Sequence, residues 1–296
     1  MANLKEVKNR ITSIQSTQQI TSAMKMVAAA KLRKAQDKIT KMRPYSENLT
    51  GILQNVSAGL DNSEGNVYSE DREVNKVLLV VVSSDRGLCG GFNSAVFKRT
   101  IALVKEKYSS VESNGGLYIL PVGKRSYEYF TKRNYQVIDD YYLMFHDLNF
   151  DAAKEAAENA MNGFVNGDYD KIELIYNEFK NVATQILKNE QFLPILPAET
   201  SSEVSDSQVD YLFEPSQEVV VNEIIPKSLK IQFYKALLES NASEHGARMT
   251  AMDQATDNAG ELLKELRLTY NRTRQAAITK EILEIVGGAE ALAANG

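Results

Sequence analysis

Residues 4–42 read LKEVKNRITSIQSTQQITSAMKMVAAAKLRKAQDKITKM. From Leu4 and Val7 onward, seam positions recur at alternating steps of three and four residues. That spacing lines them up along one side of an α-helix and is typical of a coiled-coil strand. Pro44, the first proline or glycine of the chain, is expected to stop or kink the helix, although apolar residues beyond it allow further turns. The sequence therefore predicts an N-terminal coiled-coil helix over residues 1–58.

A second stretch of the same kind lies at the other end of the chain. No proline occurs between Lys227 and Val286, the same steps of three and four recur, and Gly287 and Gly288 are expected to end the helix. These features predict a long C-terminal helix over residues 215–290. Two such helices at opposite ends of one chain are natural partners in an antiparallel coiled coil.

The two predicted seams carry polar residues where a coiled coil prefers apolar ones. These residues are Gln18, Thr21 and Lys25 in the first helix and Asn241, His245 and Arg248 in the second. One polar layer can specify register, but several layers favour faces shaped by partners outside the coil. Apolar residues also surround the last predicted turns, from Ile278 to Val286, and an exposed apolar tip indicates a binding site.

The middle of the chain alternates strand and helix patterns. Strands are predicted over 77–82, 117–122, 136–139, 171–176 and 191–196, and helices over 93–108, 124–134 and 150–166. This alternation predicts βαβ crossovers and hence a Rossmann-like α/β domain over residues 74–200. The acidic, serine-rich stretches 61–73 and 198–210 are expected to be loops.

Enzymatic chemistry is disfavoured by the residue inventory. The glycine-rich loop after the first strand, residues 83–91, has neither GxGxxG spacing nor a Walker A signature. Cys89 is the one cysteine, which excludes an internal disulfide and a thiolate zinc site. The only histidines are His146 and His245, and no nucleophile has a recognisable base beside it. We therefore expect no catalytic residue, no cofactor and no metal ligand.

Charge is distributed unevenly along the chain. Residues 1–43 carry a net charge of +8 and residues 44–226 one of −13, within an overall value of −5. A basic helix of this kind meets nucleic acid, a membrane surface or an acidic protein. Because residues 1–43 contain no aromatic residue for base stacking, an acidic protein is favoured over nucleic acid. No apolar run is long enough for a transmembrane helix, and no signal peptide is indicated.

Several stretches resemble the gamma subunit of F-type ATP synthases. They are ITSAMKMVAAAKL at 20–32, SDRGLCGGFN at 84–93, SEHGARMTAM at 243–252, and the C-terminal motifs YNRTRQAAITKE at 270–281 and EIVGGA at 284–289. They lie in the order that this family requires, so the resemblance extends over nearly the whole chain. The single cysteine and the missing transit peptide resemble bacterial members.

The resemblance implies the central rotor shaft of a rotary motor and no catalytic role. Its implied partners are three alpha and three beta subunits, the epsilon subunit and the membrane c-ring, without nucleic acid and without membrane insertion. It places the chain peripherally on the cytoplasmic side of the cell membrane. By similarity, contacts with the beta subunits are implied for two groups of residues, a lower one of Met24, Lys25 and Arg248 and a higher one of Arg274, Gln275 and Thr279.

Two functions from other classes stay open at this point. A coiled-coil scaffold with no rotary role would form stable complexes without altering any ATPase. A small α/β enzyme would bind nucleotide as an isolated chain.

Overall fold

The computed structural model describes residues 4–58, 67–70, 72–195 and 217–294. These residues form two compact units, a terminal unit within residues 1–27 and 249–296 and a central unit within residues 28–248. The elements in chain order are α1 (Leu4–Ala58), β1 (Val77–Val82), α2 (Phe92–Lys107), α3 (Ser109–Ser113), β2 (Leu117–Val122), α4 (Lys124–Thr131), β3 (Gln136–Val137), the 3₁₀ turn η1 (Met144–His146), α5 (Phe150–Val165), β4 (Lys171–Phe179), β5 (Gln185–Leu193) and α6 (Gln217–Ala294).

The central unit is built on a five-stranded sheet with the order β3-β2-β1-β4-β5. β1 pairs in parallel with β2 and β4, so that Val80 lies beside Leu120 on one side and Leu174 on the other. Every residue of β1 is buried, as expected of a central strand covered on both faces. The predicted Rossmann-like α/β fold is confirmed, with β5 added as an antiparallel edge strand.

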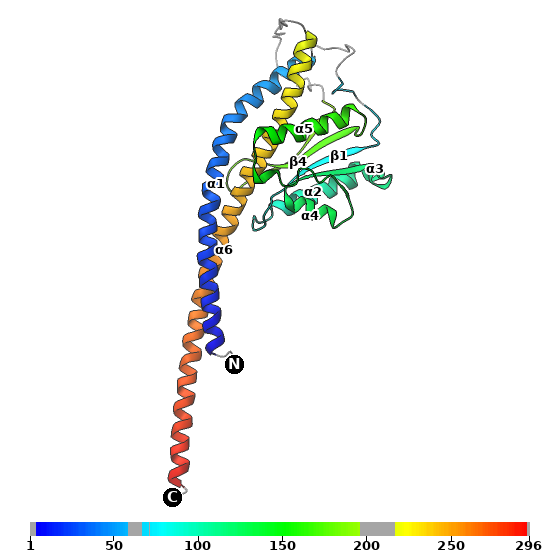
Figure 1. Ribbon diagram of the computed structural model, residues 1–296. Helices are drawn as coiled ribbons and strands as arrows, with labels where there is room; N and C mark the ends of the chain where they lie inside the picture. The colour runs from blue at the N-terminus through cyan, green and yellow to red at the C-terminus, as the bar shows by residue number, and fades with distance from the viewer. Residues whose placement is uncertain (1–3, 59–66, 71, 196–216, 295–296) are drawn as a thin grey trace. The chain divides into compact units, whose positions relative to one another are not determined.

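Helices cover both faces of this sheet (Figure 1). On one face, Phe164 of α5 and Phe233 in the central part of α6 pack against the sheet, in a core that also includes Phe192 of β5. On the other face, α2 and α4 close a second core that includes Val96, Leu103 and Phe130. The α6 residues of the first core make the long helix an integral wall of the domain, not a separate appendage.

The two long helices run antiparallel within each unit. In the terminal unit, the Thr21 and Thr256 hydroxyls lie 2.8 Å apart, and Lys25 pairs with Asp253. Residues later in α1 therefore contact residues earlier in α6, as antiparallel helices do. In the central unit, Arg43 of α1 pairs with Glu239 of α6. The predicted antiparallel pairing of the terminal helices is confirmed.

Two local helix-ending signals do not end the helices. α1 continues through Pro44 to Ala58, the last residue of the range predicted for it. Proline removes one backbone hydrogen bond, but Ile39 and Ser46 on either side of it are buried in the central unit, and their packing compensates for that loss. α6 likewise continues through Gly287 and Gly288 to Ala294. Each glycine costs a helix only about 1 kcal/mol relative to alanine, and alanines follow both of them.

The predicted edge strand begins too late in the sequence. β5 starts at Gln185, not at residue 191, and forms a hairpin with β4 whose turn is closed by Asn181 and Thr184. An edge strand is covered less completely than a central strand, so it can carry many polar side chains. The polar residues of β5 therefore do not give the apolar pattern by which a strand is predicted. Most of the loop expected at 61–73 lies outside the described residues, and so does all of the loop expected at 198–210.

Candidate functional site

Met24 and Lys25 lie on α1 in the terminal unit, beside a polar layer of the helix pair. The Lys25 ammonium is paired with the Asp253 carboxylate, and the two side chains are 40% and 47% exposed. One turn earlier, Thr21 shares a hydrogen bond with Thr256. Lys25 thus has a partner in its own chain but keeps a water-facing surface that a second protein can reach.

Apolar side chains are exposed around these two residues. Ile20, Met26 and Val27 are 59%, 64% and 58% exposed. Met24 itself is half-buried. An apolar helix surface with one ammonium group in it is suited to a protein partner, since nothing in this patch could orient a small polar ligand.

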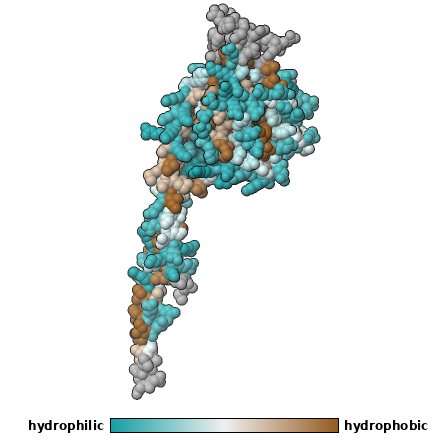
Figure 2. All heavy atoms as spheres, in the orientation of Figure 1, coloured by the Kyte–Doolittle hydropathy of each residue, from teal (hydrophilic) through white to brown (hydrophobic). Residues whose placement is uncertain are grey.

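Arg274, Gln275 and Thr279 are exposed along the last part of α6. Among the described side chains of this helix, none after Leu263 is buried. The same segment exposes five large apolar side chains, namely Ile278 (47%), Ile282 (54%), Leu283 (65%), Ile285 (71%) and Val286 (48%). Figure 2 shows apolar surface gathered along this end of the helix. This stretch of helix therefore leaves both hydrogen-bonding and apolar groups exposed.

Arg248 lies in the central unit and is held differently. Its guanidinium donates to the carbonyl oxygens of Arg86 at 2.9 Å and Gly87 at 3.3 Å, and to the Glu244 carboxylate at 2.6 Å. Only 11% of its side chain is exposed. It therefore ties α6 to the loop that follows β1. That loop exposes Leu88, at 63%, with a positive φ of 63°.

The neighbours of Arg248 are buried titratable groups. Burial raises the pKa of Glu244, and the Arg248 guanidinium opposes that rise. Burial lowers the pKa of His245 to about 4, with Arg248 and Lys31 adding to the effect. His245 is therefore neutral at physiological pH. Arg248 is therefore the cation among these three side chains, and it pairs with the Glu244 carboxylate.

The six residues implied by resemblance are thus brought together only in part. Met24 and Lys25 are adjacent on α1, and Arg274, Gln275 and Thr279 share one stretch of α6, all in the terminal unit. Arg248 belongs to the central unit and is bonded within it.

The carboxyl edge of the sheet is where open α/β folds usually bind ligands. In this strand order the crevice would lie between β1 and β4. α6 packs there instead, with Gly246 so close that an added Cβ would lie 3.3 Å from the Phe179 ring and 3.6 Å from the Val182 carbonyl oxygen. The loop after β1 turns carbonyl oxygens toward the Arg248 cation, whereas a phosphate loop turns N–H groups toward an anion.

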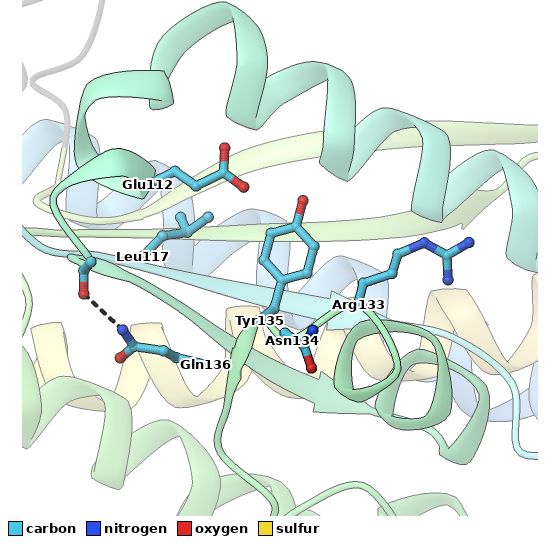
Figure 3. Close-up of a pocket in the computed structure, with 7 residues that line it drawn as sticks. Glu112, Leu117, Arg133, Asn134, Tyr135 and Gln136 are labelled. Carbon is cyan, nitrogen blue, oxygen red and sulfur yellow. Dashed lines mark hydrogen bonds between the residues drawn. The ribbon is translucent and has the colours of Figure 1, made fainter.

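A cavity of about 300 Å³ lies at the opposite edge of the sheet, where β2 and β3 begin (Figure 3). Its lining includes Glu112, Arg133 and Tyr135. Figure 3 shows the Arg133 side chain directed away from Glu112, and its guanidinium lies over the Tyr129 ring at 3.6 Å from the centroid. Desolvation is the main cause of the raised pKa of Tyr135, with Glu112 adding to it. Among the lining residues, Arg133 is the cation, and it stacks on Tyr129 instead of pairing with Glu112.

Cys89 and His146 lie elsewhere in the central unit. Cys89 is buried beside Ser84 and Asn93. His146 is exposed, with Nε2 3.8 Å from the Asp85 carboxylate. Within the described ranges, no three His, Cys, Asp or Glu residues are grouped so that they could hold a metal ion. No helix in the part of the chain that the structure describes is both long and apolar enough to span a membrane.

Sequence reasoning missed an ion pair of the central unit that is built on a fully buried carboxylate. Glu239 is fully buried and binds Arg43, a residue that the sequence offered only as one member of a basic run. One feature of the sequence could have indicated this pair: Glu239 ends the otherwise apolar stretch 236–239, and a buried carboxylate there would need a cationic partner.

Comparisons with known proteins agree with the fold and with the resemblance. A family model described as ATP synthase matches residues 3–292. The ATP synthase gamma chain of Cytophaga hutchinsonii is 60% identical over 293 residues, covering 99% of both chains. That of Chloroherpeton thalassium is 48% identical over 300 residues, again covering 99% of both.

Solved structures give the same picture at lower identity. A chain of the Tetrahymena thermophila mitochondrial ATP synthase central stalk and c-ring aligns with a TM-score of 0.58 and 26% identity, covering 80% of this chain and 99% of that one. A chain of the Euglena gracilis mitochondrial ATP synthase aligns with a TM-score of 0.69 and 21% identity over 99% and 95% of the two chains, which supports the fold. The chain therefore belongs to the ATP synthase gamma-chain family.

Proposed function

We propose that this chain is the central-stalk rotor of a proton-translocating ATP synthase. It carries rotation of the membrane c-ring to three catalytic beta subunits, and so regulates ATPase activity and proton flow without catalytic residues of its own. Residues 1–58 and 215–290 are assigned to the shaft and residues 74–200 to the α/β domain. The complex places the chain peripherally on the cytoplasmic side of the cell membrane.

The observation that carries this proposal is the unpartnered end of α6. Beyond Leu263 none of its described side chains is buried, and the exposed ones include the apolar group from Ile278 to Val286. A soluble protein keeps such a surface for a partner. A ring of alpha and beta subunits that encloses the helix would cover all sides of it at once.

The proposed partners follow from the surfaces already described. Beta subunits contact Met24 and Lys25 at one level and Arg274, Gln275 and Thr279 at another. Because the Arg248 donors are bonded within the central unit, the beta contact proposed there includes the exposed loop beside it. The α/β domain meets the epsilon subunit and the c-ring.

Rotation couples to catalysis through differential contact. One asymmetric shaft touches three beta subunits on different faces, so each is biased toward a different conformation. As the shaft turns, every site passes through the same sequence of states. The mechanism requires helix faces that differ around the shaft; at the level of Lys25, one such face carries the paired ammonium group, and Ile20, Met26 and Val27 are exposed nearby.

Reconstitution tests this function. The purified chain is mixed with alpha and beta subunits of the same organism, and size exclusion is followed together with ATP hydrolysis. We expect one copy to enter a complex with three of each and sustained hydrolysis to appear only then. If the chain enters a stable complex without changing hydrolysis, the scaffold function takes its place.

A matched pair of variants tests the assigned contacts. Thr279→Val removes an exposed helical hydroxyl from the proposed beta contact, and Thr131→Val makes the same change at the end of α4. We expect the first to lower hydrolysis by the reconstituted complex and the second to leave it unchanged. Equal activities would remove Thr279 from the contact.

A further inference from the structure

The buried carboxylate of Glu239 joins three elements of the central unit. It accepts hydrogen bonds from Arg43 Nε at 2.8 Å, from Arg43 Nη2 at 2.9 Å and from the Phe179 N–H at 3.0 Å. Arg43 Nη2 also donates to the Phe179 carbonyl oxygen at 2.6 Å. Arg43 belongs to α1, Glu239 to α6, and Phe179 is the last residue of β4. Both long helices and the sheet therefore meet at one carboxylate.

This junction is unusual in its setting as well as in its geometry. The Glu239 side chain is completely buried, whereas that of Arg43 is 38% exposed. The preceding residues of α6, Ala236, Leu237 and Leu238, are all buried and apolar. A buried carboxylate is retained at a stability cost unless every oxygen has a partner, and here both oxygens do. Stability alone would be served equally well by apolar side chains at this position.

Hydrogen bonds fix the relative orientation of two elements, whereas apolar packing does not. Apolar contacts are non-directional, so a helix can slide or turn against a sheet with little loss until the contact area changes. Hydrogen bonds weaken steeply when their angle or length changes. A bidentate Arg–carboxylate pair anchored to both backbone groups of Phe179 thus resists rotation of the sheet about the helices. It resists that movement in either direction.

We propose that the Arg43–Glu239–Phe179 junction is the torque-bearing tie between the α/β domain and the shaft. This inference rests on the proposed rotor function, in which force enters through the α/β domain and leaves through the helices. Arg43 and Glu239 are then positioning residues. They hold the sheet at a fixed angle to α1 and α6 while the shaft is under load.

The test replaces the tie with apolar side chains, so that folding is kept and directionality is lost. Arg43→Met with Glu239→Met removes both charges together, a replacement that buried ion pairs tolerate. The matched control is Arg99→Met with Glu106→Met, which removes the exposed ion pair on α2. Glu239→Gln is a second variant, nearly isosteric, that keeps an acceptor for the Phe179 N–H should the double variant fail to fold.

Two readouts separate a mechanical role from a structural one. The first is ATP hydrolysis by the complex with alpha and beta subunits alone, where the α/β domain drives nothing. The second is ATP-driven proton uptake in vesicles that contain the whole synthase. We expect the Arg43→Met/Glu239→Met complex to hydrolyse ATP like wild type but to lose proton uptake per ATP. The control should keep both.

A single-molecule measurement examines the tie directly. A probe is attached through Lys107→Cys at the end of α2, with beta subunits held on a surface. The variance of the probe angle at rest reports torsional stiffness, and we expect it to be larger in the double variant or in Glu239→Gln than in the control. Wild-type variance and wild-type proton uptake in both tie variants would overturn the inference. A wild-type chain that neither assembles nor supports uptake would instead overturn the proposed function.

Discussion

Gly123 is the position where one added methyl group should disturb the fold most. It follows β2, has a φ of 108°, and an alanine Cβ there would lie 2.1 Å from the Ser83 carbonyl oxygen. Ordinary contact begins at 3.4 Å, so β1 and β2 would have to move apart by more than an ångström at their carboxyl ends. The same strand ends anchor the loop that Arg248 holds.

The expected cost has two parts. Placing an L-residue at positive φ costs about 1–2 kcal/mol, and forcing an extra carbon into a packed site costs about 1–3 kcal/mol. Gly123→Ala should therefore lower the free energy of unfolding by about 2–5 kcal/mol. Gly167→Ala is the matched control, because Gly167 has a φ of 79° but nothing within 4 Å of its added Cβ. Only the first part, about 1–2 kcal/mol, applies there.

Near-ultraviolet circular dichroism on heating follows the central unit selectively. The chain has 14 tyrosines and no tryptophan, and every tyrosine except Tyr270 lies within residues 28–248. A difference of about 1–3 kcal/mol between the variants corresponds to a difference of roughly 2–12 °C in melting temperature for a domain of this size. If Gly123→Ala and Gly167→Ala melt at the same temperature, the close approach to Ser83 is not what requires glycine.

Three further predictions concern single groups. Folding lowers the pKa of His245 from 6.5 to about 4, so the unfolded chain takes up the proton at a higher pH than the folded chain, and the free energy of unfolding should fall by up to about 3 kcal/mol as pH drops from 6.5 to 4. The raised pKa of Glu244 has the opposite effect on stability. Urea unfolding of His245→Gln and wild type at several pH values therefore isolates the contribution of the histidine. Tyr108→Phe leaves the buried Glu173 carboxylate without its hydrogen-bond donor and should lower the free energy of unfolding in urea by about 1–3 kcal/mol. Adding Glu173→Met should restore most of that stability, and a double variant no more stable than the single one would contradict this explanation. Gly287→Ala should slow amide exchange at the end of α6, because alanine favours a helix by about 1 kcal/mol and the added Cβ meets nothing within 4 Å; unchanged exchange would refute a propensity effect.

Sequence periodicity predicts which face of each long helix is covered, but not which residues of the partner helix lie opposite. The pairing of Lys25 with Asp253 spans 228 positions and depends on the register between two helices. A seam of threes and fours is compatible with several registers, because each shift by a heptad preserves it. The polar residues of the seam could be found from sequence, and their partners could not.

Local rules also fail at some helix-ending signals and at some contacts. Pro44 and Gly287 carry ordinary helix-ending signals, yet both lie inside helices. Arg248 could be assigned by resemblance to a surface contact, but its bonds to Arg86 and Gly87 depend on how α6 crosses the carboxyl edge of the sheet. The central strand β1 was readable because six consecutive apolar residues need no partner to be recognised.

The polar layers of the terminal unit have a thermal consequence. Among its described residues, the buried apolar side chains are only Val7, Met252, Ala259 and Leu263, while Thr21 and Lys25 supply directional bonds. The heat-capacity change of unfolding follows the apolar area exposed, so this pair of helices should have a small one. Its stability then varies gently with temperature and shows little cold weakening. A shaft held together in this way would keep similar stability over a wide range of temperature.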